Sequence, residues 1–327
     1  MRTISIWKRL LPSLSLLAFA VGGAAQSVPQ LLTGGADHNL KWFDTRGMLM
    51  LALGAHLDSV TAVAVAPNGG EPLLVSSGAD GKLNLWNVNQ RRLLRTQDGH
   101  RGAITALSIS PLARYVATAG ADHQVRLWHF VKGKRLAETG AGEARLLGLF
   151  FSKDGRLLRG VDEKSLWTWN VESSVKGEVH LTLASHRDLN VGKITAVALS
   201  ADGKRLALGT ENAFVHLWNF TTNTVERKIE VSEFPVSALA FTAEGTSVAA
   251  GDERGYLRVW SVSDGKPRRF IVKTFARIRC AVFSLDGATL VTGSEDGTLH
   301  YWEPKEGKLR SRQPAHTGAV QCLTLIP

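Results

Sequence analysis

The chain has 327 residues, of which 44% are apolar and 21% charged, and its formal net charge is +10. These proportions lie close to globular averages and exclude wholesale disorder. Two cysteines, Cys280 and Cys322, are too few for a disulfide framework or a four-thiolate metal site. Composition therefore describes a basic globular protein and leaves its chemistry open.

The N-terminal residues predict an export signal. Basic residues at Arg2, Lys8 and Arg9 precede an apolar stretch over residues 10–21, and small residues follow up to Ala25. A basic start, a short apolar middle and a small-residue end make up a secretory signal peptide. We expect cleavage after Ala25 and an exported protein of the periplasm or cell envelope, or a secreted one. The plain signal favours a bacterial source. An uncleaved membrane anchor is the alternative, although a transmembrane helix needs about 20 apolar residues.

A repeat near 42 residues organises the rest of the chain. The recurring pattern ends at seven aromatic residues, namely Phe43, Trp86, Trp128, Trp169, Trp218, Trp260 and Trp302. Alternating apolar runs within each unit, such as ITALSI at 104–109, predict half-buried strands. Asp-Gly pairs such as Asp80-Gly81 predict tight hairpin turns. Four antiparallel strands per unit, repeated radially, predict an all-β fold, a seven-bladed β-propeller of four-stranded blades.

The two ends of the chain predict how the ring closes. The first unit begins with a second strand at residues 31–33, whereas the C-terminus carries a surplus first strand at residues 320–325. Joining the C-terminal strand to the N-terminal blade completes the seventh sheet and covers two open strand edges. We therefore expect residues 26–327 to form one closed domain.

Three segments carry a resemblance to a known family: SSGADGKLNLWN at 76–87, TAGADHQVRLW at 118–128 and TGSEDGTLHYW at 292–302. In these segments, and in register over the whole of residues 26–327, the sequence resembles the WD-repeat family. The resemblance implies a buried hydrogen-bonded network of His, Ser or Thr, Asp and Trp in the regular blades. Its members would be His56, Ser76, Asp80 and Trp86; His100, Thr118, Asp122 and Trp128; and, in the closing blade, His316, Thr33 and Asp37. Phe43 stands in place of the last Trp, so that network lacks the indole N–H.

A hydroxyl, a His and an Asp together also suggest a hydrolase triad. Triad chemistry needs an exposed nucleophile and an oxyanion hole, and three copies of one constellation indicate a structural role. We therefore predict no catalytic, cofactor-binding or metal site, and no cofactor.

Four blades depart from the pattern. Asn212 and Arg254 replace the turn aspartate in the fifth and sixth units, no His precedes Ile278 in the seventh, and Gly142 stands at the His position of the fourth. The longest spacing, before Trp218, predicts an enlarged loop holding residues 185–188.

The resemblance implies a platform for other proteins, with partners bound on the face that bears the loops before the first strands. Interfaces favour aromatic and Arg anchors within a polar rim. On this basis the predicted anchors lie in blades four to seven: Arg145, Lys193, Phe234, Phe275 and Arg277. A solvated mixed-charge rim without a partner is the alternative.

Basic clusters at residues 91–92, 132–135 and 266–269 lie on outer strands or their connections. Export argues against nucleic acid, which leaves acidic proteins or an anionic membrane surface as the better candidates for a basic surface. No sequence feature indicates a homo-oligomer. Cys280 and Cys322 lie in inner strands of blades that become neighbours, and two buried thiols or a disulfide bridge both remain open.

The leading hypothesis is a non-enzymatic protein–protein interaction scaffold of the periplasm or cell envelope. The alternative is a propeller enzyme, or a sensor of a cofactor or small ligand, that uses the central channel. Channel candidates are Thr61, Thr105, Thr195, Ser237, Arg279 and Gln321. They include no His and no carboxylate, so acid–base or metal chemistry lacks its parts.

Overall fold

The computed structural model describes residues 30–44, 47–68, 71–174 and 178–326. The predicted signal peptide, residues 1–25 with its cleavage site after Ala25, lies outside the described residues. Within the described ranges, no helix has the length and apolarity needed to cross a membrane.

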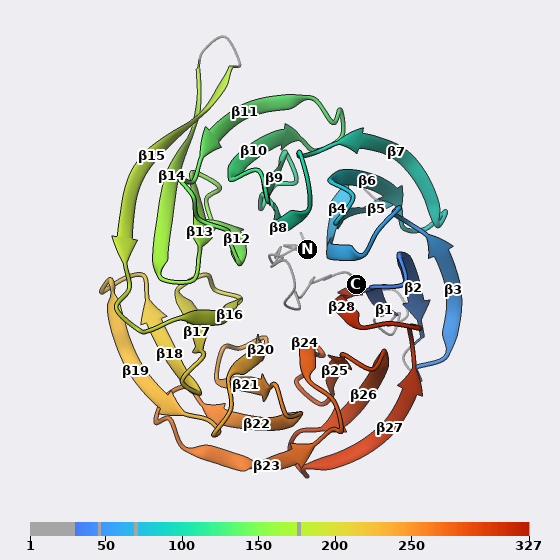
Figure 1. The fold of residues 1–327 in the computed structure, drawn as a ribbon, viewed down its shortest axis with the longest axis vertical. Coiled ribbons are helices and arrows are strands. Elements are labelled where there is room, and N and C mark those ends of the chain that lie inside the picture. Colours follow the sequence, from blue (N-terminus) through green and yellow to red (C-terminus); the bar gives the residue numbers. More distant parts are fainter. Residues whose placement is uncertain (1–29, 45–46, 69–70, 175–177, 327) are drawn as a thin grey trace, which may run out of the picture.

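Seven four-stranded antiparallel sheets stand around a central axis, which confirms the predicted seven-bladed propeller (Figure 1). Blade 1 contains β28 (Val320–Ile326), β1 (Gln30–Gly35), β2 (Asn39–Phe43) and β3 (Leu49–Gly54). Blade 2 contains β4 (Val60–Asn68), β5 (Glu71–Gly78), β6 (Lys82–Asn87) and β7 (Arg92–Asp98). Blade 3 contains β8 (Ile104–Ile109), β9 (Tyr115–Gly120), β10 (Gln124–His129) and β11 (Arg135–Gly140).

The remaining blades follow in chain order. Blade 4 contains β12 (Gly148–Phe151), β13 (Leu157–Val161), β14 (Ser165–Ser173) and β15 (Val179–Asp188). Blade 5 contains β16 (Ile194–Leu199), β17 (Arg205–Thr210), β18 (Phe214–Asn219) and β19 (Thr224–Glu230). Blade 6 contains β20 (Val236–Phe241), β21 (Ser247–Asp252), β22 (Tyr256–Ser261) and β23 (Pro267–Lys273). Blade 7 contains β24 (Ile278–Phe283), β25 (Leu290–Ser294), β26 (Thr298–Glu303) and β27 (Lys308–Pro314).

The ring closes where the chain ends meet, as predicted. β28 pairs antiparallel with β1, with Leu325 opposite Leu31, and the two strands lie side by side in Figure 1. Beyond the pair, Ala36 donates its backbone N–H to the carbonyl of Ala319 at 2.8 Å. The two facing edges of β28 and β1 are therefore paired.

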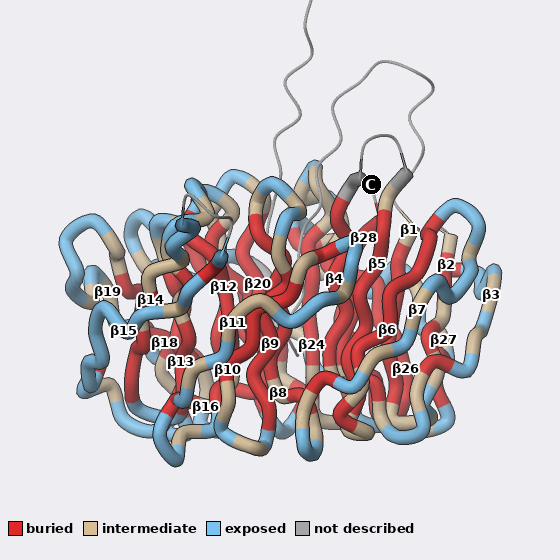
Figure 2. The backbone as a smooth tube through the Cα atoms, turned by 90° about the horizontal axis from the view of Figure 1, so that it is seen from above, coloured by how far each residue is buried: buried red, intermediate tan, exposed pale blue. Residues whose placement is uncertain are grey.

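Two faces of the ring are distinguished below. The loop face carries the connections that precede each first strand and the turns between second and third strands. The opposite face carries the turns between first and second strands and between third and fourth strands. Figure 2 shows the ring from the side, with buried strands inside and exposed turns on both faces.

Glycines in second strands allow neighbouring blades to pack closely. A Cβ built on Gly34 would lie 2.6 Å from Cγ1 of Val60, the first residue of the next blade, and one on Gly251 would lie 2.8 Å from Ile278. No real Cβ tolerates such a distance. The β-branched residue that opens one blade therefore occupies the space that glycine leaves in the blade before it.

Polar side chains also join neighbouring blades. Near the axis, Thr195 and Ser237 donate their hydroxyls at 2.6 Å to the carbonyls of Val236 and Ile278 in the next blade. At the outer rim, Arg95 donates to the carbonyl of Val131 at 2.8 Å. Hydrogen bonds to neighbouring backbone, as well as burial, therefore hold the blades in register.

One sequence expectation about blade 4 is wrong. Residues 185–188 belong to β15 and not to a loop, because the extra residues lengthen the hairpin of β14 and β15, nine and ten residues long. In the lengthened strand His186 stacks on Trp167, with ring centroids 3.7 Å apart. An aromatic contact thus keeps the added residues in the sheet.

Candidate functional site

The predicted His–hydroxyl–Asp sets come together in blades 2 and 3. In blade 2, His56 lies 3.1 Å from Asp80 through Nδ1 and 2.9 Å from Ser76 through Nε2, and Trp86 donates its indole N–H to Ser76 at 3.0 Å. Blade 3 repeats the arrangement with His100, Asp122, Thr118 and Trp128, at 2.7, 2.8 and 2.9 Å.

The donors and acceptors that each group offers determine the direction of these hydrogen bonds. An indole N–H can only donate, so the Ser76 oxygen accepts from Trp86 and turns its own proton toward Nε2 of His56. Nδ1–H of His56 then donates to the Asp80 carboxylate. Burial lowers the pKa of His56 below its ordinary value, more than the charge and hydrogen bond of Asp80 raise it. The neutral imidazole that this geometry requires is therefore also the favoured form.

Such a site does not present the hydroxyl to a substrate. The oxygen of Ser76 has no solvent exposure and accepts a hydrogen bond from Trp86. The Asp80 carboxylate meanwhile accepts the backbone N–H groups of Leu57 and Lys82, at 2.9 and 3.0 Å. The set therefore fastens the loop before β4 to the turn after β5.

The closing blade has the same set, assembled from both chain ends. His316 lies 2.7 Å from Asp37 through Nδ1 and 2.8 Å from Thr33 through Nε2. Burial raises the pKa of Asp37, but the hydrogen bond and charge of His316 and the Lys41 ammonium outweigh it and hold that pKa at about 2. Phe43 contributes no donor, and Thr33 instead reaches the Lys41 carbonyl at 3.4 Å.

Blades 4 and 7 satisfy the pattern differently. In blade 4 the turn aspartate is Asp162, which accepts directly from the indole of Trp167 at 2.7 Å, whereas the indole N–H of Trp169 has no partner. In blade 7, Thr274 occupies the His position and donates to the carbonyl of Ala276 at 2.7 Å. Blades 4 and 7 therefore close their loops without the histidine that blades 1 to 3 use.

Blade 6 lacks the set altogether. Arg126 of blade 3 and Arg258 of blade 6 occupy equivalent positions, because each donates to a carbonyl 27 residues earlier. They pair across the sheet with Thr118 and Ala250, respectively. This alignment places Ser232 at the position of His100, Ala250 at that of Thr118 and Arg254 at that of Asp122. No imidazole fills the space beside Ser232. A pocket of about 420 Å³ opens there on the loop face, lined by Glu230, Val231, Ser232, Glu233, Phe234, Tyr256 and Arg258.

Arg258 in this pocket lacks the carboxylate partners that Arg126 has in blade 3. Arg126 contacts two carboxylates, Asp122 at 3.0 Å and Glu138 at 2.7 Å. Arg258 donates to the carbonyl of Val231 at 2.8 Å, and its buried Nε has no hydrogen-bond partner. Among the described residues, no carboxylate oxygen lies within ion-pair distance of the Arg258 guanidinium. A guanidinium in such a place favours an incoming anion.

An aromatic pair flanked by cations forms one wall of the pocket. Phe234 and Tyr256 are parallel, with ring centroids 6.3 Å apart. Arg254 lies over the Phe234 ring at 5.4 Å and Lys273 over the Tyr256 ring at 4.7 Å. Aromatic and arginine side chains are enriched among the residues that contribute most to binding at protein interfaces.

The structure brings together only some of the predicted anchors. Phe234 lines the pocket, and Phe275 lies in the next loop with 90% of its surface exposed. Arg277 pairs with Glu253 of blade 6 at 3.0 Å, whereas Lys193 pairs with Glu211 within blade 5 at 3.8 Å. Arg145 is exposed in blade 4, apart from the aromatic pair.

Tyr256, Arg258 and Lys273 were missed in the sequence. The alternation of Tyr256 and Arg258 along one strand resembles an ordinary half-exposed strand, and the loss of the His set marks blade 6 only as irregular. The signal that would have found the site is the match of Arg258 to Arg126 three blades earlier, at a position where the paired aspartate has become Arg254.

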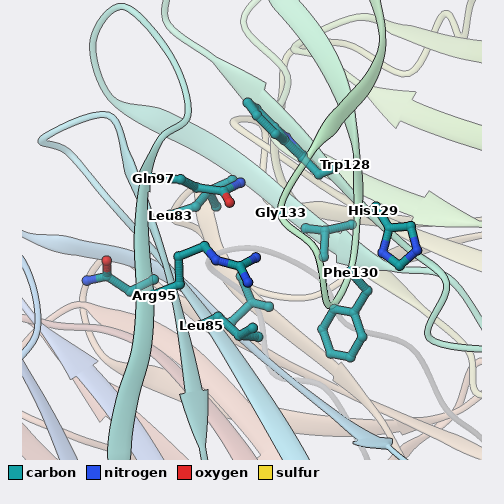
Figure 3. Close-up of a pocket in the computed structure, with 11 residues that line it drawn as sticks. Leu83, Leu85, Arg95, Gln97, Trp128, His129, Phe130 and Gly133 are labelled. Atoms are coloured by element: carbon teal, nitrogen blue, oxygen red, sulfur yellow. The ribbon is translucent and has the colours of Figure 1, made fainter.

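A second cavity serves as a comparison. Between blades 2 and 3, the space beside Arg95, Gln97, Phe130 and Gly133 holds only about 20 Å³, enough for one water (Figure 3). Here Arg95 and Gln97 point toward the turn that contains Gly133, and side chains fill the gap between blades. The blade 6 pocket is therefore much larger than this gap between blades 2 and 3.

Five of the six channel candidates contact other groups of the ring. Thr61 and Thr105 donate to carbonyls of their own blades at 3.1 and 3.3 Å, and Thr195 and Ser237 to the next blade. Arg279 lies 3.8 Å from Glu295. In the described part of the chain, no group of three His, Cys, Asp or Glu residues is placed to hold a metal ion.

Comparison with known proteins supports the assignment to repeat-containing propellers. Four segments match the WD40 family, described as WD domain, G-beta repeat: residues 47–87, 91–129, 177–219 and 267–303. They end one residue after Trp86, Trp128, Trp218 and Trp302, and no matched segment ends in blades 1, 4 or 6. The chain is a seven-bladed propeller in which these four segments match the WD40 family.

Two particular proteins are similar to it. A rice protein (Oryza sativa subsp. japonica), the small ribosomal subunit protein RACK1y, is 28% identical over 163 residues, which cover 50% of this chain and 48% of that protein. The match thus spans about half the length of this curated relative. The crystal structure of the computationally designed Ika8 protein has a TM-score of 0.64 at 22% identity and covers 98% of this chain and 91% of that one, a likeness of fold alone.

Proposed function

We propose that this protein is a non-enzymatic interaction scaffold that binds partner proteins on the loop face of blades 6 and 7, in the periplasm or cell envelope after signal cleavage. The observation that carries the proposal is the pocket beside Ser232, which opens where regular blades hold a buried histidine. WD40 propellers suit this role because a rigid ring presents several loops on one face. The rice relative is by its name a component of a larger assembly, which agrees with a role in holding proteins together.

The pocket favours a partner segment that carries both signs of charge. Arg258 offers a guanidinium without a carboxylate, so an acidic side chain of the partner fits beside it. Glu230 and Glu233 line the mouth and suit a basic neighbour in the same segment. Phe234 and the exposed Phe275 supply apolar contact around these polar groups.

The test is affinity capture from the envelope fraction of the source organism with the tagged protein. The variant replaces Phe234→Ala and Phe275→Ala, which remove apolar contact without touching the hydrogen-bonded sets. Proteins that the wild type retains and the variant loses support the proposal, and a synthetic peptide from the retained partner should then bind the wild type and not Arg258→Leu.

A matched control replaces Leu112→Ala, an exposed leucine (66%) in the turn between β8 and β9 on the opposite face. This control should retain the same proteins as the wild type. If the Phe variant also retains them, the binding face has been assigned wrongly. If the wild type retains nothing above the background of an untagged preparation, the scaffold role fails.

A further inference from the structure

The outer edge of blade 1 differs from the outer edges of the other blades. Of the seven outer strands that the structure describes, β3 is the one without a charged residue, with the sequence LMLALG, whereas β7, β11, β15, β19, β23 and β27 each contain Lys or Arg. Charged residues on an edge strand usually keep it from pairing with a strand of another molecule. Blade 1 lacks that protection.

Exposed apolar residues occupy the same position in the outer strands of three consecutive blades. Leu49 pairs across the sheet with Phe43, Leu93 with Trp86 and Leu309 with Trp302, so the three leucines occupy equivalent positions in blades 1, 2 and 7. They are 53%, 42% and 42% exposed, and Met48 is 64% exposed. The three leucines lie at the strand ends next to the turns of the opposite face, and Met48 directly precedes Leu49 there.

Basic residues lie on one side of these apolar ones, in the turns of blades 2 and 3. Residues 87–97 and 129–137, the third-to-fourth-strand turns of blades 2 and 3 with the start of the next strand, contain six Lys or Arg and no acid. Arg92, Lys132 and Lys134 are exposed. The corresponding turns of blades 1 and 7 hold Asp44, Glu303 and Glu306, of which Glu303 is paired with Arg310 at 2.9 Å. The balance of this rim is positive.

Contacts between the blades hold this surface together. Arg95 of β7 donates to the carbonyl of Val131 in the turn of blade 3 at 2.8 Å, and Figure 3 shows Arg95 beside the turn that contains Phe130 and Gly133. The basic turns of blades 2 and 3 therefore keep a fixed separation. We call Met48, Leu49, Leu93, Leu309, Arg92, Lys132 and Lys134 the apolar–basic rim.

The N-terminal strand enters at the same end of the ring. Gln30 opens β1 opposite Ile326, and Leu31 lies in one cross-strand row with Phe43 and Leu49. Because adjacent strands lie about 4.8 Å apart, Leu31 and Leu49 are separated by about 10 Å along that row. The sequence before Gln30 includes the apolar stretch at residues 10–21.

We propose that the apolar–basic rim docks on an anionic lipid bilayer surface. Exposed Leu and Met side chains enter the headgroup region, while Lys and Arg beside them contact anionic headgroups. Charge complementarity favours a bilayer of this kind as the occupant. Docking in this orientation leaves the loop face directed away from the bilayer and free to bind proteins.

The experiment uses the purified full chain with a single environment-sensitive fluorophore on Leu49→Cys. Cys280 and Cys322 are buried, so the new thiol is labelled selectively. The probe is mixed with vesicles of phosphatidylcholine and phosphatidylglycerol, or of phosphatidylcholine alone. We expect a blue shift with the anionic vesicles only, reversed by high salt because salt screens exposed charges. The same fluorophore on Phe275→Cys, on the loop face, should not respond.

Charge reversal then tests the basic part of the rim. Arg92→Glu, Lys132→Glu and Lys134→Glu together should weaken vesicle binding of the Leu49 probe at least about tenfold, whereas Arg145→Glu with Lys193→Glu on the loop face should leave it unchanged. Equal response to both vesicle types, or no response, overturns the proposal. A blue shift without vesicles that grows with protein concentration would indicate pairing of two copies along β3 and also overturns it. None of these outcomes depends on capture of a partner protein.

Discussion

Nδ1 of His316 lies 2.7 Å from Oδ1 of Asp37, although 279 residues separate them in the chain. The contact fastens the loop before β28 to the turn after β1, so a local hydrogen bond also holds the two chain ends together. Blade 1 is complete only when both ends of the sequence contribute strands to it. Ring closure therefore depends on polar contacts as well as on the pairing of β28 with β1.

Removing the Asp37 carboxylate should weaken this closure. Asp37→Ala leaves buried His316 without its hydrogen-bond acceptor. We expect the free energy of unfolding, measured in urea, to fall by about 2 kcal/mol. The matched control is Asp98→Ala, whose exposed carboxylate pairs with Lys82 at 2.7 Å and should matter little. Equal midpoints for Asp37→Ala and the wild type would show that strand pairing alone closes the ring.

Acid should destabilise the protein at a pH above the range in which most carboxylates titrate. Burial lowers the pKa values of His56, His100 and His316 below 6.5, against the raising effect of their aspartates. Below about pH 6.5 the unfolded chain then binds more protons than the folded one, so stability falls as the pH drops from 7 to 5. The pKa of Asp37, about 2 against 3.8 unfolded, adds a further loss as the pH falls from 3.8 to 2.

The melting temperature between pH 7 and pH 5 measures this dependence. Burial and the charge of Lys228 lower the pKa of His216 as well, so His216→Gln should flatten the slope. His180→Gln, at an exposed histidine, should leave the slope as it is. A melting temperature that stays constant over this range would contradict neutral buried histidines.

The two cysteines should react only after unfolding. Cys280 and Cys322 are free and fully buried, and burial raises the pKa of the Cys322 thiol to about 12. Thiolates are the reactive form, so an aromatic disulfide reagent should find no thiol in the native protein and two in denaturant. No thiol in denaturant without reductant would reveal a bridge, and rapid native reaction would show that the inner strands open.

Glycine at position 34 should be required for blade packing. A Cβ there would lie 2.6 Å from Val60 and 2.7 Å from the sulfur of Cys322, so Gly34→Ala should destabilise by about 1–3 kcal/mol through overpacking. Gly140→Ala is the control, because a Cβ there has no neighbour within 4 Å. The double variant Gly34→Ala, Val60→Ala should recover part of the loss; no recovery would place the strain elsewhere.

Restoring the regular set in blade 6 should close the pocket. The triple variant Ser232→His, Ala250→Thr, Arg254→Asp rebuilds the residues of blade 3, including a carboxylate for Arg258. We expect a higher urea midpoint and loss of the partner proteins that the wild type captures. The same partners captured at an unchanged level would show that the pocket is not the binding site.

Much of the fold could be predicted because its cause is local and repeated. Alternating apolar residues specify half-buried strands, Asp-Gly turns specify hairpins, and seven repetitions leave few ways to bury the strands. The surplus strand at residues 320–325 even predicted where the ring closes. The expected loop at residues 185–188 is wrong because the length of a hairpin depends on contacts across it, here the stacking of His186 on Trp167.

The site was harder to predict than the fold. Phe234 was chosen because aromatic residues are frequent at interfaces, and it does line the pocket, but Tyr256 and Arg258 were missed. The pocket forms because Ser232 does not supply the histidine ring that fills this position in the regular blades. No sequence motif marks a missing side chain. The predicted anchors also differ in their surroundings, since Arg277 and Lys193 already have carboxylate partners.

The sequence by itself determined the number of blades, the strand order and the His–hydroxyl–Asp sets, because each repeat encodes its own strands, turns and hydrogen bonds. Only the tertiary structure decided how the blades meet. The contacts of Gly34 with Val60, of Thr195 with the carbonyl of Val236 and of Arg95 with the carbonyl of Val131 each join residues of neighbouring blades. The pocket of blade 6 and the apolar–basic rim have the same origin, because a surface is built from residues that only the closed ring brings side by side.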